Sequence, residues 1–318
     1  MSKLKREIIT NNFIWGVLLV SNNFYAYRYF IVPTEQQMTM NQLFISDKRE
    51  LLVNFFELLK TQKKAEGSYW SKNYILYLTK ELANGLFLCK FAKQKNITIY
   101  EPGSSDIEDT PENTYPFIYI VVDLNSQILF FQEKQSIFPN RATSKNSFCQ
   151  LINSFIEDYD YLVTIDEITY EQNFWKELDS HESIYELELT MKSPNLFGSL
   201  VEAEELLKEI NKTYNNTETT LKVKNDKGKL RVVRDKIQSF IKYISAGGGK
   251  WVLGVTGKGS KRVVKIKSTH SVRTVQLHVI DDNLDLQLVI NEITVIDEII
   301  KNVNDGTTRG KNHDENQN

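Results

Sequence analysis

Short apolar runs, each ended by turn-forming residues, recur through the chain and indicate its class of fold. In residues 115–135, YPFIYIVVDLNSQILFFQEKQ, two apolar runs flank Asn125–Ser126, a pattern that predicts a β-hairpin. Residues 13–32 predict another hairpin, with its turn at Ser21–Asn23. Because hairpins predominate over strand–helix–strand alternation, the sequence predicts an α+β fold with largely antiparallel sheets built from hairpins with packed helices.

The remaining elements follow from the spacing of the apolar residues. Helices are predicted at 47–63, 72–82, 144–160, 230–244 and 292–303, with a short helical turn at 174–178 and a helix opened by the capping box Ser199–Glu202. Further strands are predicted at 85–93, 161–170, 184–191, 217–224, 250–257, 261–268, 272–280 and 284–290.

A polar segment suggests where the chain divides. Its 318 residues suffice for two domains. Residues 101–114, EPGSSDIEDTPENT, hold two prolines, a glycine and five acids, as a solvated loop does. We therefore expect an N-terminal α+β domain over 1–112 and a C-terminal α+β domain over 113–304. Residues 305–318 lack apolar side chains and are expected to be disordered.

Cysteine content and hydropathy indicate the compartment. The two cysteines, Cys89 and Cys149, fit a reducing environment and give no disulfide framework. The longest apolar stretch, residues 13–20, is far shorter than the roughly 20 residues needed to span a bilayer. We therefore expect a cytoplasmic protein with no membrane partner.

Glycines and lysines gather in residues 244–268, ISAGGGKWVLGVTGKGSKRVVKIKS. A phosphate-binding P-loop needs G-x-x-x-x-G-K-[ST] before a helix. Here Trp251 follows Gly249–Lys250, Gly259 follows Gly257–Lys258, and the next predicted element is a strand. The stretch is therefore not expected to bind a nucleoside triphosphate.

Charge is distributed unevenly along the chain. Residues 222–279 hold fifteen basic and two acidic residues, a net charge of +13, whereas the whole chain carries −2, so the rest carries −15. Such asymmetry is typical of a face that binds a polyanion. Pairing with the acidic remainder of the chain, or with an acidic protein partner, explains the same charges.

Several basic side chains are placed to face solvent together. Lys265 and Lys267 share one face of a predicted strand, and Arg231 and Arg234 lie off the apolar stripe of a predicted helix. The glycines would let backbone approach a phosphate, and Trp251 would offer a stacking surface. The predicted nucleic-acid contacts, to DNA or RNA, are Arg231, Arg234, Lys258, Lys261, Arg262, Lys265, Lys267 and Arg273.

One set of residues suggests catalysis. Asp123 ends one predicted strand, and Gln132 and Lys134 lie at the end of the next. Restriction-type nucleases use an Asp and a (Glu or Gln)-x-Lys on adjacent strands to hold a metal that activates water. The four histidines have no metal-ligand spacing. We therefore expect a non-enzymatic protein without a cofactor, with a magnesium-dependent nuclease as the alternative.

Three segments carry a resemblance: YPFIYIVVDLNSQILFF, FWKELDSHESIYELELTMKSPN and GGGKWVLGVTGKG. In these segments the chain resembles a group of uncharacterised bacterial proteins encoded beside anti-phage defence genes. The resemblance implies a cytoplasmic component of phage immunity that binds nucleic acid, with a possible protein partner from the same system. It supplies no catalytic residues. The leading hypothesis is non-sequence-specific nucleic-acid binding, followed by the nuclease and by an assembly subunit that binds an acidic partner.

Overall fold

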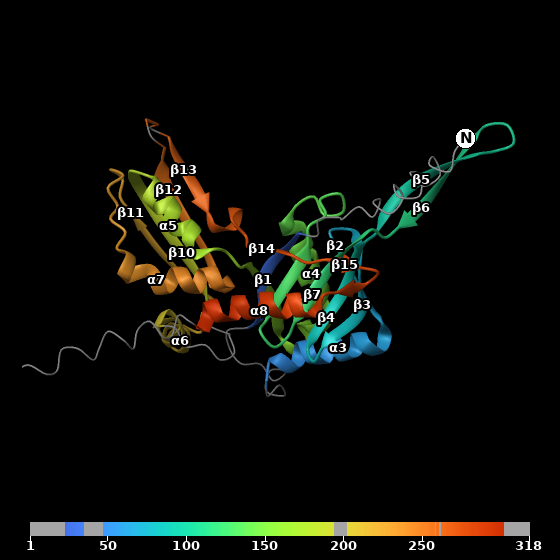
Figure 1. Ribbon diagram of the computed structural model, residues 1–318, viewed down its shortest axis with the longest axis horizontal. Helices are drawn as coiled ribbons and strands as arrows, with labels where there is room; N and C mark the ends of the chain where they lie inside the picture. Colours follow the sequence, from blue (N-terminus) through green and yellow to red (C-terminus); the bar gives the residue numbers. More distant parts are fainter. Residues whose placement is uncertain (1–22, 35–46, 194–201, 258, 261, 302–318) are drawn as a thin grey trace, which may run out of the picture.

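The computed structural model describes residues 23–34, 47–193, 202–257, 259–260 and 262–301. These residues form two units, each with its own β-sheet and hydrophobic core, and a projecting two-stranded arm (Figure 1). The α+β class with antiparallel sheets is confirmed.

The first unit is built on a curled sheet of eight antiparallel strands. Its order is β14-β1-β8-β7-β4-β3-β2, and β9 also pairs with β1. The strands are β1 (Asn23–Pro33), β2 (Lys64–Tyr69), β3 (Lys72–Ala83), β4 (Leu86–Lys93), β7 (Phe117–Asp123), β8 (Ile128–Gln132), β9 (Tyr161–Glu167) and β14 (Thr274–Gln276).

Helices cover both faces of this sheet. On one face lie α3 (Arg49–Gln62) and α4 (Arg141–Ile156), followed by the short η1 (Glu157–Tyr159). On the other lies α8 (Leu286–Lys301), with the small hairpin of β15 (Val279–Ile280) and β16 (Asn283–Leu284) (Figure 1). Strand residues alternate between the two cores.

The second unit is a four-stranded antiparallel sheet in the order β11-β10-β12-β13. Helices pack on one of its faces and bury a core that contains Trp251. The elements are α5 (Glu171–Ser180), β10 (Ser183–Lys192), α6 (Glu202–Tyr214), β11 (Glu218–Lys224), α7 (Arg234–Tyr243), the π-helix η2 (Ile244–Gly248), β12 (Gly249–Thr256), β13 (Val263–Lys267) and η3 (Ser268–His270).

The second unit is an insertion in the first. β9 and β14 both pair with one edge of β1 and meet at Ala26. The Ala26 carbonyl accepts a hydrogen bond from the Ile168 N–H over 3.0 Å, and the Ala26 N–H donates to the Arg273 carbonyl over 2.9 Å. The chain thus leaves the first sheet after β9 and returns to the same point at β14. Residues 170–272 form the insertion.

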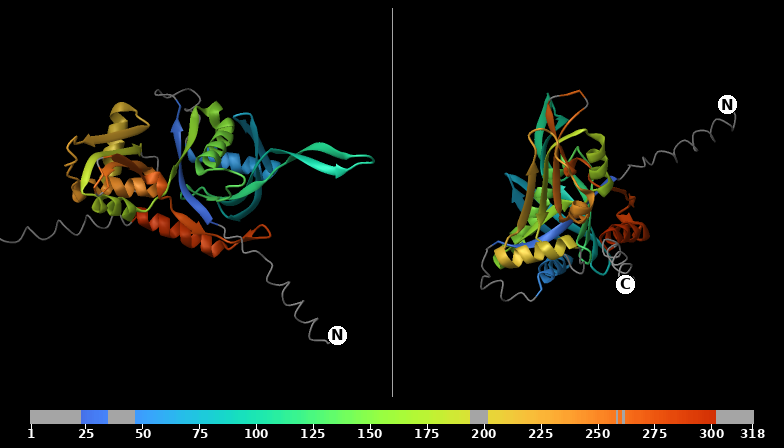
Figure 2. Two further views of the ribbon diagram at one scale, coloured as in Figure 1. Left: turned by 90° about the horizontal axis from the view of Figure 1, so that it is seen from above. Right: turned by 90° about the vertical axis from the view of Figure 1, so that its left-hand side faces the viewer.

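The arm consists of β5 (Lys95–Pro102) and β6 (Ile107–Thr114), which pair only with each other. It projects from the end of the first sheet, on the side remote from the second unit (Figures 1 and 2). Apart from Gly103, every residue between Glu101 and Asn113 is exposed.

Two predicted elements and one predicted loop are wrong in type. Residues 72–82 form strand β3 instead of a helix, because β2 and β4 supply hydrogen-bonding partners on both sides and bury Tyr74 and Leu76 on one face. Residues 284–290 belong largely to α8, whose buried stripe includes Val289, Ile293 and Ile296 at helical spacing. The segment expected as a loop at 101–114 forms most of the arm.

The domain boundary expected at residues 112–113 does not separate the two sheets. Strands from both sides of that point, β4 and β7, hydrogen bond to each other within the first sheet. The hairpin predicted at 115–135 is confirmed as β7–β8. Its counterpart at 13–32 contributes β1, and the rest of it, like Ser199 and the tail, lies outside the described residues. No helix within the described ranges is both long and apolar enough to cross a membrane.

Candidate functional site

The two faces of the second sheet differ in chemistry. Leu187, Leu189, Trp251 and Leu253 point toward the helices and are buried. Because successive side chains of a strand alternate between faces, the residues between them point away from the helices. Five lysines of this second face are exposed, so no element of the described chain covers them: Lys222, Lys224, Lys250, Lys265 and Lys267.

Strand register places these lysines in rows. Lys224 on β11, Glu186 on β10, Gly254 on β12 and Lys265 on β13 form one row. The next row contains Lys222, Glu188, Val252 and Lys267 in the same strand order. Lysines on the two outer strands therefore flank a central ridge of two glutamates. We name this surface the lysine face: Lys192, Lys222, Lys224, Lys250, Lys265, Lys267, Glu186, Glu188 and Glu218.

Glu186 is the electrostatic centre of the lysine face. Its carboxylate lies 3.1 Å from Nζ of Lys222, 3.4 Å from Nζ of Lys224 and 3.3 Å from Nζ of Lys265. Lys265 reaches it across Gly254, whose missing side chain leaves room: a Cβ there would lie 3.0 Å from the Glu186 Cβ. Burial raises the pKa of Glu186, but hydrogen bonds from these lysines outweigh it, so the net pKa is lower than usual.

The glutamates neutralise only half of the lysines. Lys222 also pairs with Glu188, and Lys192 pairs with Glu218 over 3.1 Å. Six lysines against three glutamates leave a net charge of +3 on the lysine face. Within the described chain, Lys250 and Lys267 form no ion pair. The charges thus partly satisfy one another and partly remain available to an anion.

The structure divides the eight predicted contact residues among several places. Lys265 and Lys267 belong to the lysine face, and Arg262 is exposed just before β13. Arg231 is exposed in the segment before α7. Lys258 and Lys261 lie outside the described residues.

Two of the predicted arginines have structural contacts away from the lysine face. Arg234 lies on α7, where its guanidinium is 4.5 Å from the centre of the Trp175 ring and 3.2 Å from Asp179. Arg273 belongs to the first unit, is only 12% exposed, and lies 3.8 Å from Glu292 and 5.5 Å from the Tyr170 ring centre. The described members of the predicted set therefore do not all lie on one surface.

The three consecutive glycines serve packing and leave no space for a phosphate. A Cβ on Gly247 would lie 2.6 Å from the Arg28 Cβ, one on Gly248 2.4 Å from the Tyr243 ring, and one on Gly249 2.1 Å from the Thr190 carbonyl oxygen. All three glycines are buried where η2 passes between the two units. Trp251 is also buried, against Phe174, so it offers no stacking surface.

The residues predicted for a nuclease are not brought together. Asp123 pairs with Ile128 at the turn of the β7–β8 hairpin, whereas Gln132 lies at the opposite end of β8, about 13 Å along the strand. Asp123 accepts hydrogen bonds from the N–H groups of Asn125 and Ser126, and burial raises its pKa. Lys134 lies 5.2 Å from the Phe117 ring centre, and burial lowers its pKa.

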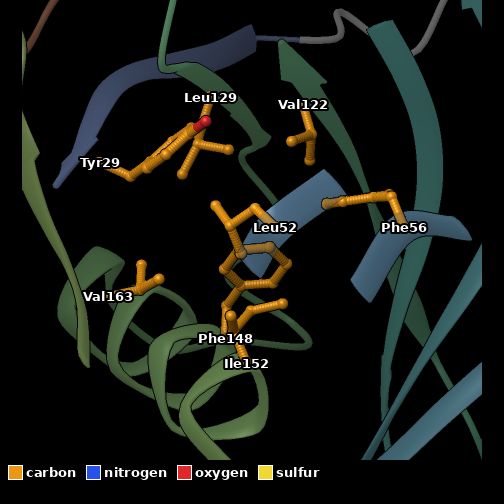
Figure 3. A pocket seen from close by; sticks show the side chains of 8 residues that line it. All are labelled: Tyr29, Leu52, Phe56, Val122, Leu129, Phe148, Ile152 and Val163. Atoms are coloured by element: carbon orange, nitrogen blue, oxygen red, sulfur yellow. The ribbon is translucent and has the colours of Figure 1, made fainter. Parts of the chain in front are cut away.

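The described residues offer no metal centre, and the gap inside the first unit is too small for a ligand. No group of three His, Cys, Asp or Glu side chains among them could hold a metal ion. An internal gap lies between α3, α4 and the first sheet, lined entirely by apolar and aromatic side chains such as Leu52, Phe56 and Phe148 (Figure 3). Its volume is only about 10 Å³, so it is a packing defect too small for a ligand.

Sequence reasoning counted Lys222, Lys224 and Lys250 in the charge of the segment but did not place them at the site. Alternation along the strand predicted at 217–224 puts Lys222 and Lys224 on one face, and this signal could have identified them. The glutamates of β10 were missed because only strand pairing brings them between the lysines. No protein-family profile, curated protein or solved structure matches this chain.

Proposed function

We propose that this protein binds nucleic acid without sequence specificity, through the lysine face of its second unit. The observation that carries the proposal is an open antiparallel sheet face with lysines on both outer strands and an excess of three positive charges. Lysine is a point-charge ligand for phosphates, and phosphate contacts position a strand without reading its bases. The role in anti-phage defence stays a prediction from the resemblance.

The salt dependence of binding tests this proposal. Labelled duplex DNA, single-stranded DNA and RNA are titrated by fluorescence anisotropy across a salt series. On duplex DNA the log–log slope should lie between about −2, if only the unpaired Lys250 and Lys267 reach phosphates, and about −4.5, if all five exposed lysines do. No binding to any of these probes at low salt would reject the proposal.

Matched variants locate the contact. Lys265→Gln/Lys267→Gln should weaken binding and flatten the slope by about one if Lys265 stays with Glu186, and by about two if both lysines reach phosphates. Lys212→Gln/Lys236→Gln removes the same charge from exposed positions on α6 and α7, beyond the helix-covered face, and should leave the slope nearly unchanged. Glu186→Gln should tighten binding, because it adds one net positive charge to the lysine face. Equal losses in both lysine pairs would show that only total charge matters.

A second candidate function is assembly, and the arm favours it. Residues 95–114 hold five acids and one lysine, and the arm lies at the opposite end of the molecule from the lysine face (Figure 1). The arm of a second copy therefore complements the lysine face in charge. Head-to-tail contacts of this kind give rings or open filaments. Light scattering at low and high salt distinguishes this function, because an arm-mediated oligomer would dissociate as salt rises.

A further inference from the structure

The turn between β2 and β3 holds a tryptophan in an unusual position. Trp70 and Ser71 have φ values of +51° and +57°, and their flanking residues Tyr69 and Lys72 pair in the ladder. Such turns favour Asn and Gly, because a left-handed backbone strains residues with larger side chains. The Trp70 side chain is nevertheless 81% exposed, and the Tyr69 ring lies beside it with 6.0 Å between ring centroids. This turn therefore presents a large aromatic surface to water.

A polar groove begins at the next residue of this turn. It has a volume of about 600 Å³ and lies between the β2–β3 turn, the connection from β4 to β5, and the loop after β8. Amide and hydroxyl groups of Asn73, Gln94 and Ser136 contribute hydrogen-bonding groups to its wall. No carboxylate lines it.

Three lysines line the same groove without a counter-charge. Lys72, Lys93 and Lys95 form no ion pair with any other described residue. Burial, followed by repulsion from Lys72 and Lys95, lowers the pKa of Lys93. Like charges gathered in this way destabilise the unbound protein, and an anion in the groove would remove the repulsion.

We propose that this groove binds an unpaired nucleotide, with its phosphate among Lys72, Lys93 and Lys95 and its base stacked on Trp70. Lysines without a carboxylate suit a phosphate, and the exposed indole of Trp70, one residue before Ser71 at the edge of the groove, suits a base. The nucleotide is either a free nucleoside phosphate or one unit of a single strand. This site lies on the first unit, at the base of the arm, and is separate from the lysine face proposed above.

The experiment combines calorimetry with tryptophan fluorescence on the full chain. The probes are AMP, a short thymidine strand and inorganic pyrophosphate. Of the other three tryptophans, Trp175 and Trp251 are buried and Trp15 lies outside the described residues, so the part of the quenching by AMP or by the strand that disappears in Trp70→Phe reports stacking on Trp70. Binding of AMP identifies a free nucleotide as a ligand, and binding of the strand alone identifies single-stranded nucleic acid.

Variants separate this groove from the lysine face. Lys93→Gln, which relieves repulsion and so preserves the fold, should weaken binding at least tenfold. Trp70→Ala should weaken it about 5- to 150-fold. Lys267→Gln, on the lysine face, should leave AMP binding unchanged. The proposal is overturned if AMP and the strand both fail to bind at millimolar concentration, if Lys93→Gln has no effect, or if pyrophosphate binds as tightly as AMP without quenching.

Discussion

The Arg28 guanidinium, on β1 of the first unit, donates a hydrogen bond to the Ala246 carbonyl, in η2 of the second unit, over 3.0 Å. It also donates to the Ser126 carbonyl over 3.3 Å and lies 3.8 Å from the Asp297 carboxylate. One buried side chain thus joins the inserted unit, a hairpin turn and α8. The insertion is fixed to the first sheet by the two chain connections, after β9 and before β14, and by this charged group.

Arg28→Met should destabilise the whole protein. The substitution keeps a long side chain but leaves two carbonyls without their donor and Asp297 without its cation, at a cost of about 2–4 kcal/mol in the free energy of unfolding. Urea denaturation followed by circular dichroism measures this loss. The exposed Arg231→Met should change stability by less than about 0.5 kcal/mol. A loss below about 1 kcal/mol for Arg28→Met would show that Arg28 does not join the units.

Gly249→Ala and Gly257→Ala should differ sharply, although both change a glycine in the same basic segment. A Cβ at Gly249 meets the Thr190 carbonyl at 2.1 Å, and φ is +151° there, whereas a Cβ at Gly257 has nothing within 4 Å. We expect Gly249→Ala to cost about 3 kcal/mol or more and Gly257→Ala to stay within about 0.5 kcal/mol. Thermal unfolding of the two variants measures the difference, and equal melting temperatures would contradict the packing role of Gly249.

Stability should fall in acid through Glu186. Its folded pKa is lowered by its lysines, so its contribution is fully present above the unfolded value of about 4.3 and is lost as pH falls through the folded pKa. Glu186→Gln removes this titration. The stability difference between wild type and Glu186→Gln should therefore be largest near neutral pH and shrink below about pH 4. Denaturation at several pH values tests this, and a difference that grows in acid would contradict it.

Trp70→Gly should make the protein more stable. Glycine adopts the left-handed φ of +51° without strain, and Trp70 contributes little burial because it is 81% exposed. The expected gain is about 1 kcal/mol. Differential scanning calorimetry measures it. A loss of stability would mean that the indole packs against the fold and is not held out for a ligand.

The sequence predicted what local patterns encode and missed how the strands are arranged in the sheets; the mispredicted strand β3 is an exception, since its partners β2 and β4 are its neighbours in the chain. The β7–β8 hairpin could be predicted because its turn and both apolar runs lie within 115–135. Residues 72–83 have helix-forming residues such as Leu76 and Glu81, and only pairing with β2 and β4 makes them a strand. The insertion of residues 170–272 could not be predicted, because it depends on β9 and β14 sharing one edge of β1.

The candidate site shows the same division. Charge counting found the basic segment and alternation found Lys265 and Lys267, since both signals are local. Glu186 lies 79 positions from Lys265 in the sequence, and only the sheet brings the two within 3.3 Å. Trp70 was missed because the turn that exposes it lies beside a segment predicted as a helix.

The arm offers a place to attach a reporter. Its turn, between Pro102 and Ile107, joins two strands that pair only with each other, so an inserted peptide or a cysteine label there would disturb none of the hydrophobic cores. The turn lies about 20 Å along β5 from Lys95. A dye at this tip would therefore report a single-stranded nucleic acid that extends from the groove, and it would not block the entrance of the groove. The same position would also serve to tether the molecule to a surface by one end.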